Sequence, residues 1–139
     1  MKRIYRQQQI VDFMAVIMQF TRIKINWSYF SEEAPDLKRA CWAFPLAGWL
    51  LGLIAGGLGH TLILMGLPIV LSCAIATAFC IYLSGAYHED GLADMADGLG
   101  AGGDGKKISN IIHDSRLGTY GVSALSLAII VRILLVSSL

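Results

Sequence analysis

Charged residues are absent from a long stretch in the middle of the chain. No Asp, Glu, Lys or Arg occurs between Ala40 and Tyr87. A helix needs roughly 20 apolar residues to cross the hydrocarbon core of a bilayer, so this stretch is long enough for two crossings. Gly66 and Pro68 supply the turn signal inside it. The pattern therefore predicts a helical hairpin with spans at about 42–65 and 68–87.

A third apolar segment, at about 121–139, contains a single charge, Arg132. A charge inside a span is costly unless its side chain reaches the membrane surface or faces a polar bundle interior, and the sequence leaves both interpretations open. The segment ends in Ser137, Ser138 and Leu139, without the charged or aromatic residues that usually anchor a span at the interface. We expect the chain to be the N-terminal portion of a longer protein.

Apolar residues near the N-terminus repeat at helical spacing. Ile10, Phe13, Met14 and Ile17 fall on one face of a helix, and basic residues lie on both sides of the segment. Because the segment is short and flanked by charge, it predicts a helix that lies in the membrane interface, at about 8–22.

The composition also indicates a membrane protein. Hydrophobic residues make up 55% of the chain and charged residues 15%, and the mean hydropathy is +0.61. These values are too apolar for an ordinary soluble domain. The net charge of +1 argues against a nucleic-acid partner, because such binding depends on an excess of basic residues. Membrane lipid is the expected partner instead, and a homo-oligomer is compatible with the sequence.

Basic residues lie on both sides of the predicted hairpin and not at its turn. The positive-inside rule places such residues in the cytoplasm. The N-terminus and the polar segment after the hairpin are therefore expected to face the cytoplasm, with the chain in the cytoplasmic (inner) membrane. The residues concerned are Lys2, Arg3, Arg6, Arg22, Lys24, Lys38 and Arg39 before the hairpin and Lys106, Lys107 and Arg116 after it.

The hairpin is followed directly by an acidic segment, which contains Glu89, Asp90, Asp94 and Asp97. If the segment is helical, the three aspartates lie along one face, where their charges repel unless a cation or a proton separates them. Mg²⁺ held by carboxylates usually completes its coordination with water and substrate phosphate. The four acids therefore predict a Mg²⁺ site for phosphate chemistry at a membrane surface, with Asp97 or His88 as the catalytic base.

Glycines dominate the next segment, 98–105. Its sequence fits two phosphate-binding patterns in outline, GxGxxG and a P-loop, but both belong after a β-strand, and no strand is expected here. We interpret the segment as a mobile cover over the acidic site, or as a flexible linker. Asp104 then predicts the N-cap of a short helix whose buried side carries Ile108, Ile111 and Ile112.

A polar segment connects that short helix to the third span. Arg116 offers a planar fork that suits phosphate oxygens, although a polar connector with a surface salt bridge is the other interpretation. The expected fold is all-α: a polytopic integral membrane helix bundle, in one domain over 1–139, with an N-terminal interfacial helix and a cytoplasmic active-site loop. The expected substrate-binding residues are Lys106, His113, Ser115, Arg116 and Thr119.

Two motifs carry a family resemblance. The runs from His88 to Gly98 and from Asp114 to Gly121 resemble motifs of cobalamin synthase, the adenosylcobinamide-GDP ribazoletransferase family. The runs from Phe20 to Arg22 and from Phe44 to Gly48 are similar to the N-terminal pattern of that family. The resemblance implies a Mg²⁺-dependent phosphotransferase that joins adenosylcobinamide-GDP to α-ribazole, or to its 5′-phosphate, and releases GMP. That reaction is the final nucleotide-loop assembly step of cobalamin biosynthesis.

Two other classes of protein remain as alternatives. A CDP-alcohol phosphotransferase of lipid synthesis also uses several aspartates and Mg²⁺ at a membrane face, but its motif expects Ala-Arg where this chain has Asp94 and Met95. A cation transporter would use the acids as an ion path. The acids lie beside a glycine-rich segment rather than in the middle of a span, which favours a surface site.

Overall fold

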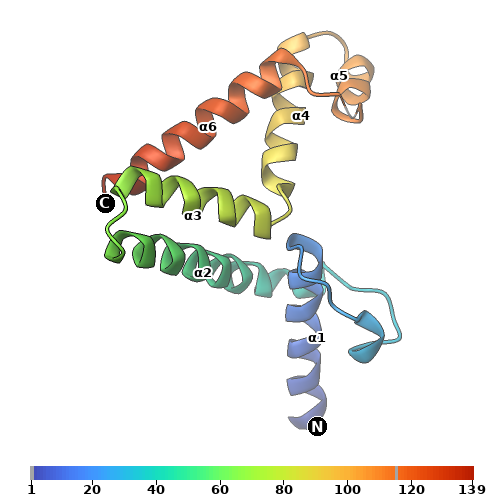
Figure 1. Cartoon of the computed structure of the whole chain (residues 1–139). Helices are drawn as coiled ribbons and strands as arrows, with labels where there is room; N and C mark the ends of the chain where they lie inside the picture. The colour runs from blue at the N-terminus through green and yellow to red at the C-terminus, as the bar shows by residue number, and fades with distance from the viewer. Residues whose placement is uncertain (1, 115) are drawn as a thin grey trace.

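The computed structural model describes residues 2–114 and 116–139, and within these residues the chain is helical without β-strands (Figure 1). Helix α1 is followed by two short 3-10 helices, and the remaining five α-helices are joined by short turns. The bounds are α1 Lys2–Phe20, η1 Trp27–Tyr29, η2 Arg39–Ala43, α2 Phe44–Leu64, α3 Ile69–Leu83, α4 Tyr87–Ala101, α5 Gly105–Ile112 and α6 Thr119–Ser137.

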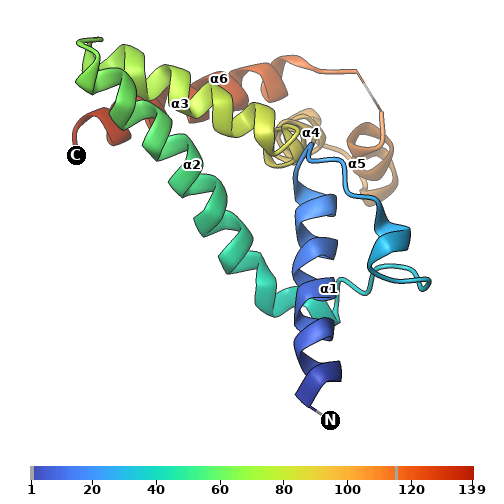
Figure 2. The same cartoon turned by 60° about the horizontal axis from the view of Figure 1, so that its bottom comes forward.

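Helices α2 and α3 form the predicted hairpin; they lie side by side in Figure 1 and diverge away from their turn in Figure 2. The turn begins at Gly66, which has a φ of +91°, a conformation that favours glycine. The N–H of Gly66 donates to the carbonyl of Ile63 and the N–H of Leu67 donates to that of Leu62, so the helix ends in a Schellman motif. The predicted turn is confirmed.

Two helical segments are long and apolar enough to cross a membrane by their length and composition. They are Arg39–Leu64, which joins η2 to α2, and Thr119–Ser137. Helix α3 ends at Leu83, earlier than the predicted 87, because the chain takes a left-handed turn at Gly85, with φ +69°. Helices α3 and α4 meet at 88° and meet the criteria for a span only as a bent pair.

Helices α3, α4 and α6 form the sides of a triangle (Figure 1). The short helix α5 packs against α4 near the corner where α4 and α6 meet. Gly98 of α4 allows this contact, since a Cβ there would lie within 2.7 Å of the Ile112 side chain. The predicted loop at 98–105 is therefore wrong in its first half: α4 continues to Ala101, and only a short turn separates it from α5.

Helix α1 packs its C-terminal half against η2 and α2. It begins and ends earlier than the predicted 8–22. Its buried face meets small residues that allow close approach; the core cluster consists of Val16, Ile17, Ala40, Ala43 and Ala47. The position of α1 relative to a membrane stays a prediction.

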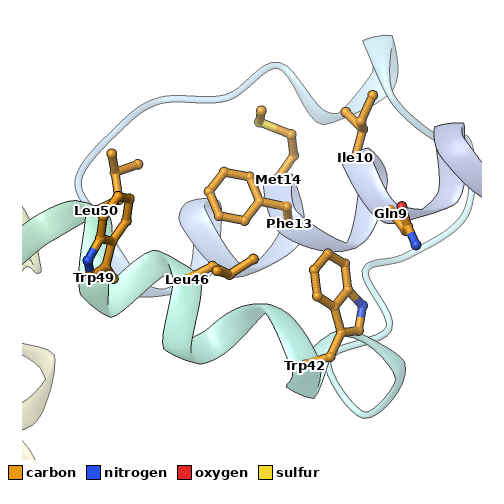
Figure 3. Close-up of a pocket in the computed structure, with 8 residues that line it drawn as sticks. All are labelled: Gln9, Ile10, Phe13, Met14, Trp42, Leu46, Trp49 and Leu50. Atoms are coloured by element: carbon orange, nitrogen blue, oxygen red, sulfur yellow. The ribbon is translucent and has the colours of Figure 1, made fainter.

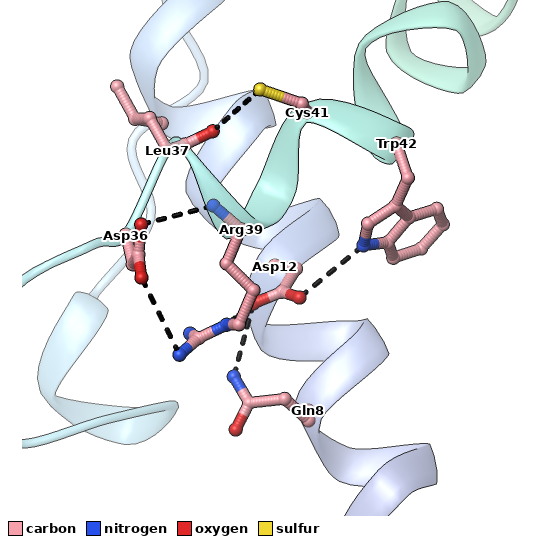
Figure 4. Close-up of polar contacts among 7 residues, drawn as sticks. All are labelled: Gln8, Asp12, Asp36, Leu37, Arg39, Cys41 and Trp42. Carbon is pink, nitrogen blue, oxygen red and sulfur yellow. Dashed lines mark hydrogen bonds and ion pairs between the residues drawn. The ribbon is translucent and has the colours of Figure 1, made fainter.

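A buried carboxylate fixes α1 to η2 (Figure 4). The side chain of Asp12 accepts hydrogen bonds from Gln8 (3.1 Å), from Arg39 Nε (2.9 Å) and from Trp42 Nε1 (3.4 Å). Burial of the carboxyl group raises its pKa, but the three hydrogen bonds and the Arg39 charge together outweigh burial and hold the pKa of Asp12 below its ordinary 3.8. This network orders the chain just before the first span.

An apolar groove of about 490 Å³ opens between α1 and the start of α2 (Figure 3). Phe13 and Met14 line it from α1, while Trp42, Leu46 and Trp49 line it from the η2–α2 segment. Tryptophan is favoured where a span meets the membrane surface, because one part of its ring is apolar and its N–H is polar. The groove thus lies on a surface suited to lipid contact.

Candidate functional site

Helix α4 carries the four acidic residues, so the segment is helical as the sequence analysis supposed. The helix begins after Ala86, whose carbonyl accepts the N–H of Asp90. The four carboxylates do not point to a single place. They divide into three environments: a cavity beside α5, an ion pair with α6, and the N-terminus of α6.

Asp90 and Asp94 face a cavity of about 420 Å³ enclosed by α4, the end of α5 and α6. Asp90 is exposed and Asp94 is half-buried, so both reach solvent. His113 and Arg116 line the same cavity from the segment between α5 and α6. The cavity therefore combines the carboxylates of α4 with a guanidinium and an imidazole from the segment after α5.

Glu89 also lines this cavity but is 7% exposed. Its Oε1 atom accepts a hydrogen bond from Arg132 Nη1 at 3.0 Å, which forms an ion pair between α4 and α6. Its Oε2 atom is buried and has no hydrogen-bond partner. The sequence left open whether Arg132 reaches the membrane surface or faces a polar bundle interior. In the structure its side chain contacts the Glu89 carboxylate.

Asp97 does not line the cavity and instead caps α6. Its Oδ2 atom accepts the backbone N–H of Gly118 at 2.7 Å, and its Oδ1 atom accepts that of Gly121 at 2.8 Å. A Cβ atom at either glycine would overlap the Asp97 carboxylate. Free N–H groups and the helix dipole favour a negative charge at a helix N-terminus, so this contact stabilises α6 against α4.

Asp114 and Arg116 form the surface salt bridge that was the second interpretation of this segment. Arg116 Nη2 lies 2.6 Å from Asp114 Oδ2, and Arg116 Nε lies 3.0 Å from the same oxygen. These hydrogen bonds lower the pKa of Asp114 and raise that of Arg116. Arg116 thus lines the cavity while its guanidinium is hydrogen-bonded to Asp114. Ser115, a predicted substrate-binding residue, lies outside the described residues.

The remaining predicted site residues do not line this cavity. Lys106 is exposed on α5, and Thr119 is exposed at the first position of α6, where its carbonyl accepts the Ser123 hydroxyl. His88 lies on the side of α4 that faces α1, with its ring 6.3 Å from that of Phe20. The structure brings neither predicted base, Asp97 or His88, into the lining of the cavity.

A metal ion bound by side chains needs several ligand atoms close together. Over residues 2–114 and 116–139, no three His, Cys, Asp or Glu side chains are grouped closely enough to hold a metal in their present positions. Asp90, Asp94 and Glu89 nevertheless line one cavity, and carboxylate oxygens are the ligands that Mg²⁺ prefers. The Oε2 atom of Glu89 has no hydrogen-bond partner among the described residues. Asp97 has both oxygens engaged by backbone N–H groups. The four-residue Mg²⁺ site stays a prediction.

Sequence reasoning missed two contacts that build the site. The ion pair between Glu89 and Arg132 was signalled only by the presence of a charge in an apolar segment, which requires a polar partner. The cap that Asp97 places on α6 was signalled by Gly118 and Gly121, which flank the start of the third span and admit a side chain from another helix.

Comparisons with known proteins identify the family of the chain. Residues 12–139 match the family described as cobalamin-5-phosphate synthase. The chain is 38% identical over 133 residues to an adenosylcobinamide-GDP ribazoletransferase of Azorhizobium caulinodans, which covers 94% of this chain and 50% of the relative. A protein of the same name from Bradyrhizobium diazoefficiens is 48% identical over 101 residues, which is 70% of this chain and 38% of that relative.

The chain spans about half the length of the curated relatives it matches. No solved structure matches it. The family match covers almost every residue of the site, from Glu89 to Arg132. The chain belongs to the cobalamin-5-phosphate synthase family.

Proposed function

We propose that this chain contributes the phosphate-handling site of an enzyme that joins adenosylcobinamide-GDP to α-ribazole, or to its 5′-phosphate, with release of GMP. The observation that carries the proposal is the cavity in which Asp90 and Asp94 lie opposite His113 and Arg116. The names of the relatives, adenosylcobinamide-GDP ribazoletransferase, support this choice of reaction. They do not favour a lipid phosphotransferase or a cation transporter.

The charges around the cavity suit a diphosphate. The Arg116 guanidinium can donate two parallel hydrogen bonds to phosphate oxygens, in place of those it now donates to Asp114. His113 Nδ1 lies 2.7 Å from the Ser109 carbonyl, a contact that orients its ring at the end of α5. These two residues would hold the diphosphate and stabilise the GMP that departs when the acceptor hydroxyl attacks.

Asp90, Asp94 and Glu89 Oε2 would hold Mg²⁺ in this cavity. The ion would neutralise the diphosphate charge, which phosphoryl transfer requires. Arg132 forms an ion pair with the buried Glu89 carboxylate through its Oε1 atom. We assign Asp97 to the support of α6, since both its oxygens accept backbone N–H groups. No base is assigned.

The membrane setting of the proposal is the cytoplasmic membrane, with α4 and α5 on the cytoplasmic side. Basic residues before α2 and after α4 support it, together with the uncharged turn at Gly66. Cysteine substitution at Gly66 and at Lys106, in a chain without its native cysteines, tests this orientation. Labelling of Lys106→Cys from the cytoplasm and of Gly66→Cys from the outside is expected, and the reverse pattern would overturn it.

Because the chain covers half of its relatives, activity is best tested in two preparations. One is this chain alone in lipid nanodiscs. The other is the Azorhizobium caulinodans relative with its matching segment replaced by this chain. Each is incubated with adenosylcobinamide-GDP, α-ribazole and Mg²⁺, and GMP is measured. We expect GMP release that requires α-ribazole in the chimera. No release from a folded chimera whose parent enzyme is active would overturn the proposal.

A further inference from the structure

A second cavity, of about 220 Å³, lies where the end of α1, the first two turns of α2 and the start of α4 meet. None of the described contacts of the acidic site uses it. Side chains of α1 and α4 enclose it from one side, while small residues of α2 leave it open from the other. Its lining includes Val16, Phe20, Phe44, Gly48, Leu51 and His88.

Aromatic rings form much of the wall. The Phe20 ring is at the centre of the group: it meets the edge of Phe44 with the centroids 5.1 Å apart, and it meets Tyr87 at 5.2 Å. The rings of Phe20 and His88 are within 25° of parallel, with centroids 6.3 Å apart. A flat ring stacked between two others needs about 3.5 Å on each side, so a small outward movement of His88 admits one.

The chemistry of the wall restricts the ligand. Among the described residues, no Lys, Arg, Asp or Glu lines the cavity, so a phosphate or diphosphate finds no charge there to balance its own. The imidazole of His88 is the polar group among the lining residues and offers one hydrogen bond. An apolar site with aromatic walls and a single polar group fits an uncharged, flat heteroaromatic ring that carries one hydrogen-bonding nitrogen.

The cavity is also close to the acidic site along the helix. His88 immediately precedes Glu89 and Asp90, and Ala86, at the start of the same turn, lines the acidic cavity. The two cavities therefore lie on different sides of the first turn of α4. A ligand with a flat base at one end and a hydroxyl at the other would be held at the base end by Phe20 and His88.

We propose that this cavity binds the benzimidazole base of the nucleoside acceptor, and so determines which base the enzyme accepts. The inference rests on the proposed function, because the acceptor is the ribazole of that reaction. An acyl chain of a membrane lipid is the competing occupant. The position of His88 favours the base, since its exposed imidazole can form a hydrogen bond with a ring nitrogen, whereas an acyl chain offers no hydrogen-bonding group.

Filling the cavity gives the sharpest test. Gly48 lines it, and a Cβ added there meets no atom within 4 Å, so Gly48→Leu extends into the open space without a backbone clash. Gly52, one turn further along α2, also has open space around it but does not line the cavity, so Gly52→Leu is the matched control. Both substitutions favour a helix over glycine.

The measurement is equilibrium binding of α-ribazole, and separately of free 5,6-dimethylbenzimidazole, to the protein in nanodiscs without the other substrate. We expect Gly48→Leu to weaken both by about tenfold or more while Gly52→Leu leaves both unchanged, because only the first fills the cavity. His88→Phe, which keeps an aromatic wall, should weaken both through the lost hydrogen bond. Helical content and the unfolding temperature of each variant serve as the check of folding.

Several outcomes would overturn the inference. Unchanged binding in Gly48→Leu would place the base elsewhere, and absence of base binding to the unaltered protein would favour a lipid occupant. The same experiments distinguish this inference from the proposed function. Base binding without GMP release in the chimera would contradict the proposed reaction but still support the base-binding site. GMP release in the chimera, together with unchanged acceptor affinity in Gly48→Leu, would support the proposed reaction but contradict the base-binding site.

Discussion

Arg132 Nη1 lies 3.0 Å from Oε1 of Glu89, and this ion pair joins α6 to the first turn of α4. Glu89 is therefore the partner of Arg132, the charged residue within the third apolar segment. Both ionised groups are thereby accounted for in a helix bundle whose outer surfaces at α2 and α6 are apolar. Glu89 also lines the cavity that Asp90 and Asp94 share, and its Oε2 atom has no hydrogen-bond partner among the described residues.

Removing one partner of this pair should destabilise the protein. Arg132→Met leaves the buried Glu89 charge uncompensated, and we expect a loss of about 2 kcal/mol in the free energy of unfolding. The double variant with Glu89→Gln should recover much of that loss, since no charge is then left without a partner. Reversible denaturation of the four proteins in detergent measures the coupling. Additive losses would show that the two side chains do not interact.

The contact between Asp97 and α6 leads to a second prediction. Gly121→Ala forces a Cβ into the Asp97 carboxylate, and Asp97→Asn loses the charge at the helix N-terminus. Each should lower the free energy of unfolding by about 1–2 kcal/mol. Gly57→Ala is the control, because a Cβ at Gly57 meets nothing within 4 Å. An Asp97→Asn protein with unchanged stability and weakened Mn²⁺ binding would instead make Asp97 a metal ligand.

The network around Asp12 should depend on pH. Its pKa is lower in the folded protein than the ordinary 3.8, so its contribution to stability is fully present above 3.8 and is lost as the pH falls through the folded-state pKa. Asp12→Asn should therefore lower the unfolding temperature at pH 7 but have little further effect at pH values below the folded-state pKa. Asp36→Asn is the control and should have a smaller effect, because the exposed Asp36 carboxylate lies 3.9 Å from Arg39 Nη1 and, among the described residues, accepts only the Arg39 backbone N–H, at 3.1 Å. A constant difference between Asp12→Asn and the unaltered protein at every pH would contradict the assignment.

Arg116 is expected to act on the substrate rather than on the metal. Arg116→Lys keeps the charge but loses the planar fork, and we expect kcat/KM for adenosylcobinamide-GDP in the chimera to fall about 30-fold, equivalent to about 2 kcal/mol. Mn²⁺ affinity, measured in the same preparation, should be unchanged. Unaltered catalysis, or lost metal with unaltered substrate affinity, would show that Arg116 has another role.

Much of the fold was accessible from hydropathy alone. The uncharged stretch before Tyr87 and the turn at Gly66 define the hairpin, because burial in lipid and turn geometry are local properties of the sequence. The capping of α5 by Asp104 is confirmed for the same reason: its Oδ1 atom accepts the N–H of Lys107, three residues along the chain, at 2.9 Å. The early end of α3 was missed because Ser84 and Gly85 lack the proline that marked the other turn.

The site was harder to predict, since it depends on which helices meet. Helical spacing placed Asp90, Asp94 and Asp97 along one face of α4, and of these the first two line the cavity. Asp97 is drawn to the N-terminus of α6, whose start is far along the chain and supplies backbone donors that no spacing rule can reveal. Arg132 and Arg39 likewise find acidic partners in other helices, at positions that follow from tertiary packing alone.

The central claim is that the α4 carboxylates in the cavity carry the phosphate chemistry, and the GMP release rate of Asp94→Asn in the chimera tests it most directly. Asp36→Asn is the matched control, because Asp36 lies outside the cavity and is exposed. The account predicts that Asp94→Asn lowers the Mg²⁺-dependent rate by roughly 100-fold or more, with Asp36→Asn and the folding of both proteins unaffected. A near-normal Mg²⁺-dependent rate in Asp94→Asn would contradict it.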